Sequence, residues 1–354
     1  MKTSIQLSGL AIGCALALNP AVAAMHEPQS AATHPPKANA QMQAVLDAHA
    51  KLDPKVIETL APAEARKQPS PADAVKSLLE SQSKSTAPET VAKVENRTFP
   101  GPGGAVPIRI YTPAGNGPMP VVLYIHGGGW VIADLDTYDA SPRAIANAAK
   151  AIVVSTHYRQ GPENKFPAAH DDTLAAYKWV LANATDIGGD PKRVALVGES
   201  AGGNMAANIA IAARDQKLQA PVHQVLVYPV ANNDLNSPSF QENANAKPLN
   251  KAMIEWFVKH YLGDAAGAAD PRIALVKQPN LAGLAPATII LAQIDPLRSD
   301  GEAYAAALGK AGVPVKLQHY QGVTHEFFGM GAVVDTAKEA VGVAAADLKA
   351  AFGK

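Results

Sequence analysis

The fold is decided by one stretch of the sequence, Val194-Ala-Leu-Val-Gly198-Glu-Ser200-Ala-Gly202-Gly203-Asn204. It joins an apolar run typical of a buried strand to an alanine-rich run typical of a helix. Between them, Gly-x-Ser-x-Gly is the signature of a strained turn that lifts a serine hydroxyl clear of a sheet. The glycines on either side of Ser200 have no Cβ atom, so strand and helix can pack closely. Because a bare pentapeptide also occurs by chance in chains rich in Gly and Ala, its meaning depends on the rest of the sequence.

From about residue 88 onward, segments typical of strands alternate with segments typical of helices. A Gly/Pro turn at residues 100–104 joins the first two predicted strands. The predicted strands span Val91–Phe99, Val106–Tyr111, Val121–Ile125, Ala151–Thr156, Val194–Val197, Val225–Val230, Thr288–Ile294 and Val313–Leu317. Predicted helices between them include Ser141–Ala149, Asp172–Ala182 and Glu302–Ala311. Apolar strands that alternate with helices indicate an α/β fold, with a parallel sheet covered by helices on both faces.

Two segments depart from this alternation. Residues 41–87 contain three short amphipathic helical patterns, which are separated by prolines and cannot bury much by themselves. Residues 231–283 form a long interval with a polar start and an aromatic helix predicted at Met253–Leu262. Insertions of this length are more often functional than idle. We therefore predict that both segments form a helical cap, and that residues 88–230 and 284–354 form the core. An ordinary crossover helix with a long loop is the alternative for the insertion.

The N-terminus has the features of a signal peptide in residues 1–24. Lys2 precedes an apolar stretch that is too short to span a bilayer, and Ala21-Val22-Ala23 forms a cleavage pattern. Residues 25–40 are rich in Pro, Ala and Ser and predict a flexible leader. The sequence thus predicts a periplasmic or secreted protein without stable membrane association after cleavage. An uncleaved or membrane-anchored N-terminus is the alternative. Cys14, the only cysteine, would leave with the signal peptide, so export does not imply disulfides here.

Composition restricts the partners and cofactors. The 354 residues are 47% hydrophobic and 18% charged, as in a globular enzyme with a sizeable core. The formal net charge is zero and no basic run occurs, so nucleic acid is not an expected partner. His325-Glu326 is not a zinc motif, because Gly329 stands where a second histidine would be needed. A dinucleotide fingerprint is also absent, and neither a metal nor another cofactor is expected.

A serine at neutral pH needs a base, an orienting acid and donors for an oxyanion before it can act as a nucleophile. His126-Gly127-Gly128-Gly129-Trp130 follows a predicted strand and exposes consecutive backbone N–H groups. It matches a glycine-rich oxyanion loop, whose amides act together with the N–H of the residue after the nucleophile. A glycine-rich turn at a strand end is the simpler interpretation of the loop alone. His126 itself is expected to hold the loop and not to transfer protons.

The acid and the base are expected at the ends of later strands. Asp295 closes an apolar run and is followed by a proline that ends the strand, and Asp300 is a nearby competitor. His325 lies in a glycine-bounded loop after the last predicted strand. Ser200, Asp295 and His325 therefore follow one another in the serine, acid, histidine order of α/β-hydrolases.

Several blocks of sequence together resemble the hormone-sensitive lipase family of α/β-hydrolases, the bacterial family IV carboxylesterases. The resemblance extends from about residue 40 to the C-terminus. The blocks are His126-Gly-Gly-Gly-Trp130, Tyr158-Arg159 with Pro162-Glu163-x-x-Phe166-Pro167-Ala168, Gly198-Glu-Ser-Ala-Gly-Gly203, Asp295-Pro-Leu-Arg298 and His325. Their presence together and in this order is highly specific.

The resemblance implies an eight-stranded sheet, a helical cap and a pocket for short acyl groups. It implies Ser200 as the nucleophile, His325 as the base and Asp295 as its partner. The implied oxyanion donors are Gly127, Gly128 and Ala201, and the residues expected to contact substrate are Trp130, Glu199, Trp256 and Phe257. Two departures from the family pattern, at Glu199 and at Ser299-Asp300, are expected to reshape the acyl or alcohol side of the pocket.

These features predict a serine carboxylesterase that hydrolyses short-chain acyl esters through an acyl-enzyme on Ser200. The expected partner is a small-molecule ester, and a homodimer is the oligomer considered. The same triad acting on amides, lactones or polyester oligomers is an alternative. A non-catalytic ligand-binding protein on this fold is disfavoured, because such receptors in the family lack the histidine present here as His325. A true lipase is disfavoured because no broad apolar surface segment is evident, although fold does not fix substrate.

Overall fold

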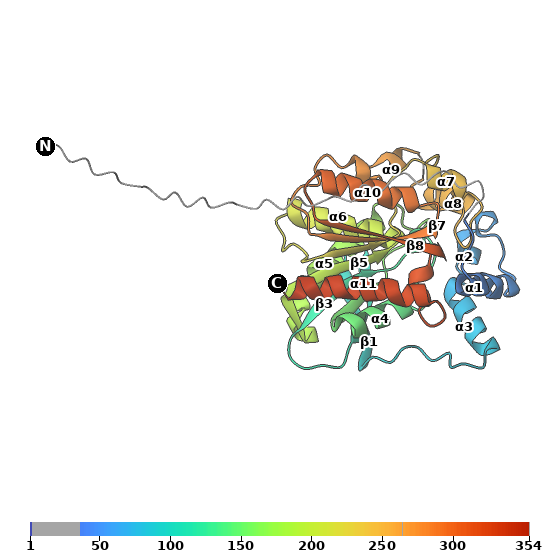
Figure 1. Cartoon of the computed structure of the whole chain (residues 1–354), viewed down its shortest axis with the longest axis horizontal. Helices are drawn as coiled ribbons and strands as arrows, with labels where there is room; N and C mark the ends of the chain where they lie inside the picture. Colours follow the sequence, from blue (N-terminus) through green and yellow to red (C-terminus); the bar gives the residue numbers. More distant parts are fainter. Residues whose placement is uncertain (2–35, 264, 354) are drawn as a thin grey trace. The chain divides into compact units, whose positions relative to one another are not determined.

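The computed structural model describes residue 1 and residues 36–263 and 265–353 (Figure 1). The described residues from 36 onward belong to one compact unit. Apart from residue 1 and residues 36–40, the predicted signal peptide and leader lie outside the described residues, so export and these two segments remain predictions. Among the residues described, no helix has both the length and the apolar character needed to cross a bilayer.

Eight strands form one sheet in the order β1-β2-β4-β3-β5-β6-β7-β8. They span Lys93–Gly101 (β1), Gly104–Thr112 (β2), Met119–Ile125 (β3), Ile152–Thr156 (β4), Gly189–Glu199 (β5), Gln224–Val227 (β6), Ala287–Ile294 (β7) and Val315–Thr324 (β8). β1 and β2 form a hairpin, and β2 also pairs with β4 in antiparallel orientation. The remaining neighbours, from β4 through β3 to β8, are parallel. The predicted eight-stranded, mostly parallel sheet is confirmed.

Three strand ends differ from the prediction by more than two residues. β5 begins at Gly189, five residues before the predicted Val194. The apolar run predicts that β6 reaches Val230, but β6 ends at Val227, because Tyr228 has a φ of 35° that breaks the extended backbone. β8 continues to Thr324, beyond the predicted end at Leu317. It is the last strand of the sheet and several of its side chains are exposed, so it lacks the continuous apolar pattern of a buried strand.

Helices cover both faces of the sheet, as predicted (Figure 1). α4 (Ala140–Ala149) and α11 (Asp335–Phe352) pack on one face. The other face is covered by α5 (Ala168–Asn183), α6 (Ala201–Asp215) and α10 (Arg298–Lys310). The sheet is therefore buried between two layers of helices.

Strand β3 shows how the sequence produces two hydrophobic cores. Val121, Leu123 and Ile125 belong to the core beneath α5, α6 and α10. The alternating residues Val122 and Tyr124 belong to the core beneath α4 and α11. Successive side chains of a strand point to opposite faces, so apolar residues at every position indicate a strand covered on both sides. This packing fixes the carboxyl ends of the strands, where the candidate site residues stand.

The N-terminal segment contains four short helices, α1 (Ala40–Lys51), η1 (Ile57–Thr59), α2 (Pro62–Ala65) and α3 (Pro71–Ser81). Three of them match the predicted helical patterns, whereas α2 is additional. Pro62 is predicted to separate two helices, but proline is favoured at the first helical position, where its missing N–H costs nothing. The backbone N–H of Asn39 donates to the oxygen of Gly322 at 2.8 Å and ties this segment to the core.

The insertion between β6 and β7 contains α7 (Pro238–Glu242), α8 (Lys251–Tyr261), α9 (Ala265–Ala269) and η3 (Leu275–Lys277). α8 confirms the aromatic helix predicted at Met253–Leu262. Nε1 of Trp256 on α8 donates to the backbone oxygen of Leu60, just after η1, at 3.1 Å. The insertion and the N-terminal segment are therefore in contact, at the same end of the sheet (Figure 1).

Candidate active site

Ser200 occupies the turn between β5 and α6. Its backbone has a φ of 57° and a ψ of −118°, outside the regions that residues other than glycine prefer. A Cβ atom on Gly198 would lie 2.2 Å from the carbonyl oxygen of Gly202, and one on Gly202 would lie 2.0 Å from that of Ile125. Glycine is required at both positions because β5, α6 and β3 pack closely around the turn.

The structure brings Ser200, His325 and Asp295 together. Nε2 of His325 lies 3.0 Å from Oγ of Ser200, and its Nδ1 lies 2.7 Å from Oδ2 of Asp295. Asp295 directly follows β7 and His325 directly follows β8, so neighbouring parallel strands deliver the pair to one edge of the sheet. All three side chains are buried. These are the contacts that a serine nucleophile, a general base and an orienting acid require.

The surroundings of His325 strengthen it as a base. Burial lowers the pKa of its imidazole, but the charge and hydrogen bond of Asp295 raise it, as do the charges of Glu326 and Glu199. Together these charges outweigh burial and hold the pKa above its ordinary value of 6.5. Asp295 is itself fixed, because its Oδ1 accepts the backbone N–H of Leu297 at 2.8 Å. An imidazole that is oriented by a carboxylate and lies within hydrogen-bond reach of the serine is suited to general base catalysis.

The glycine loop lies beside Ser200. Within the described part of the chain, no hydrogen-bond acceptor is found for the backbone N–H groups of Gly127, Gly128 and Gly129. Gly128 and Gly129, with φ of 89° and 55°, line a cavity together with Ser200, whereas Gly127 does not. Ala201 begins α6, so its N–H has no partner inside that helix. Gly127, Gly128 and Ala201 therefore stay the predicted oxyanion donors, and Gly129 becomes a further candidate because it lines the cavity beside Gly128.

Buried rings hold this loop from behind. Oη of Tyr158 donates to the backbone oxygen of Gly127 at 2.8 Å, and Nε2 of His126 lies 3.1 Å from Nδ1 of His157. Burial, followed by the charge of His157, lowers the pKa of His126 to about 3. The ring is therefore neutral at physiological pH, which fits the supporting position expected of His126.

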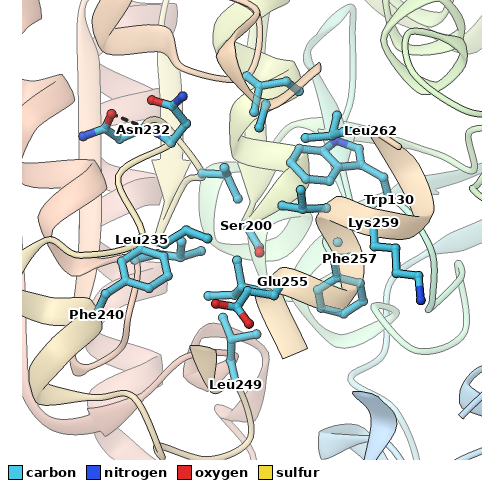
Figure 2. Close-up of a pocket in the computed structure, with 18 of the residues that line it drawn as sticks. Trp130, Ser200, Asn232, Leu235, Phe240, Leu249, Glu255, Phe257, Lys259 and Leu262 are labelled. Atoms are coloured by element: carbon cyan, nitrogen blue, oxygen red, sulfur yellow. Dashed lines mark hydrogen bonds between the residues drawn. The ribbon is translucent and has the colours of Figure 1, made fainter. Parts of the chain in front are cut away.

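Two cavities meet at Ser200. The first has a volume of about 370 Å³ and is bounded mainly by apolar side chains of the insertion. Figure 2 shows Leu235, Phe240, Leu249, Phe257 and Leu262 around the Ser200 hydroxyl. The second cavity, of about 120 Å³, has His325 in its wall as well as Ser200. Residues of the N-terminal segment, including Ile57, Ala65 and Arg66, complete it.

The four residues expected to contact substrate fall into two groups. Trp130 lines the first cavity and Phe257 lines both. A Cβ atom on Gly129 would lie 2.2 Å from the Phe257 ring, so α8 packs directly on the glycine loop. Trp256 lines neither cavity, because its indole faces the N-terminal segment and bonds Leu60. Its predicted contact with substrate is therefore corrected to a contact between the insertion and the N-terminal segment.

Glu199 also lies away from both cavities, which corrects its predicted place in the substrate pocket. Its side chain is fully buried behind the serine turn. Oη of Tyr124 donates to one carboxyl oxygen at 2.5 Å, and Oη of Tyr228 donates to the other. Burial, then the charge of Glu326, raises the pKa of Glu199 to about 7. The Tyr228 ring packs on the His325 imidazole with their centroids 4.3 Å apart, so this tyrosine links the carboxyl group of Glu199 to His325.

Glu326 is a site residue that sequence reasoning misses. It lines the second cavity with Ser200 and His325, and Oη of Tyr138 lies 2.6 and 2.7 Å from its two carboxyl oxygens. Burial is the main cause that raises its pKa. Its position directly after the histidine is the one sequence signal that could have marked it.

Asp300, the competitor for the acid, has a different position. Its Oδ2 accepts the backbone N–H groups of Ala231 and Asn232 at 3.1 and 2.8 Å, at the start of the insertion. It therefore anchors the insertion, whereas Asp295 is the acid bonded to Nδ1 of His325. In the part of the chain that the structure describes, no group of three or more His, Cys, Asp or Glu residues is arranged to hold a metal ion.

Comparison with known proteins shows the family to which a chain with this site belongs. A family model described as the α/β-hydrolase fold matches residues 122–329, which include Ser200, Asp295 and His325. The chain belongs to this α/β-hydrolase family. This α/β-hydrolase is 42% identical over 274 residues to the carboxylesterase NlhH of Mycobacterium tuberculosis, covering 75% of this chain and 86% of the relative. It is 37% identical over 241 residues to an ethyl acetate hydrolase of Pseudomonas putida, covering 67% of this chain and 76% of that relative.

Solved structures agree with the sequence comparisons. A thermostable esterase from Pseudomonas putida matches the α/β-hydrolase with a TM-score of 0.80 and 31% identity, over 90% of this chain and 98% of the other. An ester hydrolase from the metagenome of Lake Arreo matches with a TM-score of 0.80 and 34% identity, over 90% of this chain and 100% of the other. The resemblance to the hormone-sensitive lipase family is confirmed.

Proposed function

We propose that this α/β-hydrolase is a serine carboxylesterase that hydrolyses small esters with short acyl chains. The observation that carries the proposal is the buried row of Ser200, His325 and Asp295, with contacts of 3.0 and 2.7 Å. The names of two relatives, a carboxylesterase and an ethyl acetate hydrolase, support an ester as the substrate. Asp295 holds the imidazole with its proton on Nδ1 and stabilises the imidazolium that forms during the reaction.

The reaction proceeds through an acyl-enzyme. His325 removes the proton of Ser200 as Oγ attacks the carbonyl carbon of the ester. The backbone N–H groups of the glycine loop and of Ala201 stabilise the negative charge that develops on the carbonyl oxygen. His325 then gives its proton to the departing alcohol, which leaves the acyl group on Ser200. A water molecule, deprotonated by the same imidazole, releases the carboxylic acid and restores the serine.

The two cavities have different roles in this mechanism. His325 must reach the oxygen of the departing alcohol, and it lines the second cavity but not the first. The alcohol therefore occupies the second cavity and the acyl chain occupies the first. The apolar wall of the first cavity, with Leu235, Phe240 and Leu249, suits a hydrocarbon chain.

A fluorophosphonate probe tests whether Ser200 is activated. Such probes react with a serine that has a base and oxyanion donors beside it. We expect one adduct per chain, located on Ser200 by peptide mass spectrometry, and no adduct in Ser200→Ala. The matched control is Ser81→Ala, which removes an exposed serine of α3 and should label like the wild type. An unlabelled wild-type protein would overturn the proposal and favour a non-catalytic ligand-binding protein.

A further inference from the structure

A carboxyl group in the wall of the second cavity lies beside the reacting atoms. Glu326 follows His325 in a left-handed backbone conformation, with a φ of 72°. Its Oε1 lies 3.9 Å from Nε2 of His325, the nitrogen that faces Ser200. The hydroxyl of Tyr138 reaches both carboxyl oxygens but can donate only one hydrogen. The carboxylate therefore keeps acceptor capacity for a ligand in the cavity.

Among the residues that the structure describes, no lysine or arginine pairs with Glu326. Among the described residues, its one basic neighbour within 4 Å is His325, whose Nδ1 proton is engaged by Asp295. Arg66 also lines the cavity, but its guanidinium binds the carboxylate of Glu163 and the backbone oxygen of Gly161. The cavity wall thus contains a carboxylate without a cationic partner of its own.

The surroundings of the cavity are acidic as well. Glu199 and Asp295 are fully buried, and within the described residues neither pairs with a lysine or an arginine. Carboxyl groups gathered behind low-dielectric walls focus a negative potential into a cleft and concentrate cations there. A bound cation also favours the ionised form of a nearby carboxyl group.

The rest of the wall suits the carbon skeleton of an alcohol. Ile57, Ile132, Met253 and Phe257 supply apolar contacts. The rings of Phe257 and Tyr138, which both line the cavity, can also attract an ammonium group, because the face of an aromatic ring is electronegative.

We propose that the second cavity is a subsite for esters whose alcohol carries a positive charge, such as amino-alcohol or quaternary ammonium esters, with Glu326 as the residue that selects them. The ester oxygen binds Nε2 of His325, and Oε1 of Glu326 is 3.9 Å from that nitrogen. An ammonium group two carbons from the ester oxygen therefore lies within reach of the carboxylate. The inference rests on the proposed esterase function and specifies the alcohol part of the ester substrate.

Two esters that differ only in charge test this subsite. Butyrylcholine carries a trimethylammonium group, and 3,3-dimethylbutyl butyrate has an uncharged tert-butyl group of the same shape. At constant ionic strength and pH 8, we expect kcat/KM of the wild type to be about 10-fold higher for butyrylcholine. In Glu326→Gln the ratio of the two kcat/KM values should fall to about 1. The ratio is the readout, because any effect of the Glu326 charge on His325 changes both rates together.

Glu255→Gln is the matched control. Glu255 is exposed and lines the first cavity, so this change removes the same charge on the acyl side of Ser200. Figure 2 shows Glu255 among the residues that line the first cavity. The ratio should stay at the wild-type value in this variant. An equal fall in both variants would overturn the subsite, because the preference would then come from general charge.

The other outcomes separate the subsite from the esterase function. A wild-type ratio near 1 with both esters hydrolysed would overturn the subsite and leave the esterase intact. Hydrolysis of neither ester would overturn both. Should Glu326→Gln fail to fold, inhibition of the wild type supplies the answer: tetramethylammonium should compete with p-nitrophenyl butyrate, whereas sodium at equal ionic strength should not. Equal inhibition by both ions would contradict the subsite.

Discussion

Tyr228 links a buried carboxyl group to the imidazole of His325. Its hydroxyl donates to Glu199, and its ring packs on the imidazole with the centroids 4.3 Å apart. Its backbone has a φ of 35°, which is unusual for a bulky residue and is held by the surrounding packing. Since Tyr228 lines neither cavity, we expect it to act on the reaction by holding His325 in place.

Removal of the Tyr228 hydroxyl should therefore lower turnover without weakening substrate binding. In Tyr228→Phe the ring remains beside the imidazole, but it loses its hydrogen bond to Glu199. The ring is then no longer held in place against His325. We expect kcat for p-nitrophenyl butyrate to fall about 10- to 100-fold, because small displacements of a catalytic group have effects of this size. KM should change less than about twofold.

Tyr320→Phe is the control for that measurement. Tyr320 is also buried, and its hydroxyl has no hydrogen-bond partner among the described residues. Its loss should leave kcat unchanged. A Tyr228→Phe variant in which KM rises and kcat stays constant would show that the hydroxyl serves binding and not the position of His325.

At the level of single residues, motifs predicted the reacting groups but not their surroundings. Ser200 and Asp295 each follow an apolar strand, and His325 lies in a glycine-bounded loop near the C-terminus, so each has a local signal. The loop glycines are identical in sequence, so the sequence does not indicate which of them line the cavity. Glu199 precedes Ser200 directly, and successive side chains of a strand point to opposite faces, so its carboxyl group lies behind the site.

The insertion supplies most of the first cavity, and its loop residues should set the length of acyl chain that fits. Leu235 is half-buried and lines this cavity. In Leu235→Trp the larger side chain should fill space that a longer chain needs. We expect kcat/KM for p-nitrophenyl hexanoate to fall at least about 10-fold relative to p-nitrophenyl acetate, a loss of about 1.4 kcal/mol of transition-state stabilisation.

Leu218→Trp is the matched change outside the cavity, because Leu218 is also half-buried against the core. It should reduce hydrolysis of both esters equally or not at all. If Leu235→Trp likewise left the ratio of the two esters unchanged, the first cavity would not hold the acyl chain.

Long periodic elements were predictable, whereas short ones were not. α8 has an aromatic pattern over three turns and was predicted from it. α2, α7 and α9 have four or five residues each, too few to show a period. The assembly of the insertion with the N-terminal segment depends on contacts between distant residues, such as Trp256 with Leu60, which no local pattern encodes.

At the scale of the whole molecule, buried carboxyl groups should make stability depend on pH. Burial raises the pKa of Asp300 from 3.8 to about 8 and that of Glu199 to about 7. The folded protein therefore keeps protons that the unfolded chain releases above about pH 4. This contribution to stability is fully present below the unfolded pKa and is lost as the pH rises toward 8.

The Tm of the wild type should accordingly fall between pH 5 and pH 8. Asp300→Asn keeps an acceptor for the N–H groups of Ala231 and Asn232 but cannot titrate. Between the two pH values, the Tm of this variant should therefore fall less than that of the wild type, and the two falls should differ by about 3 °C or more. Scanning calorimetry at the two pH values checks this. The exposed Asp215→Asn should follow the wild type. If the Tm of Asp300→Asn fell in parallel with that of the wild type, Asp300 would not be protonated in the folded protein.

The central claim is that the hydroxyl of Ser200 performs the hydrolysis. Its most direct test is the turnover of p-nitrophenyl acetate by Ser200→Ala, compared with the wild type at equal concentration and with the fold checked by circular dichroism. A loss on the order of 10⁶-fold in kcat is expected, because a triad without its nucleophile retains only the contributions of binding and the oxyanion donors. Turnover of the folded variant close to that of the wild type would contradict the account.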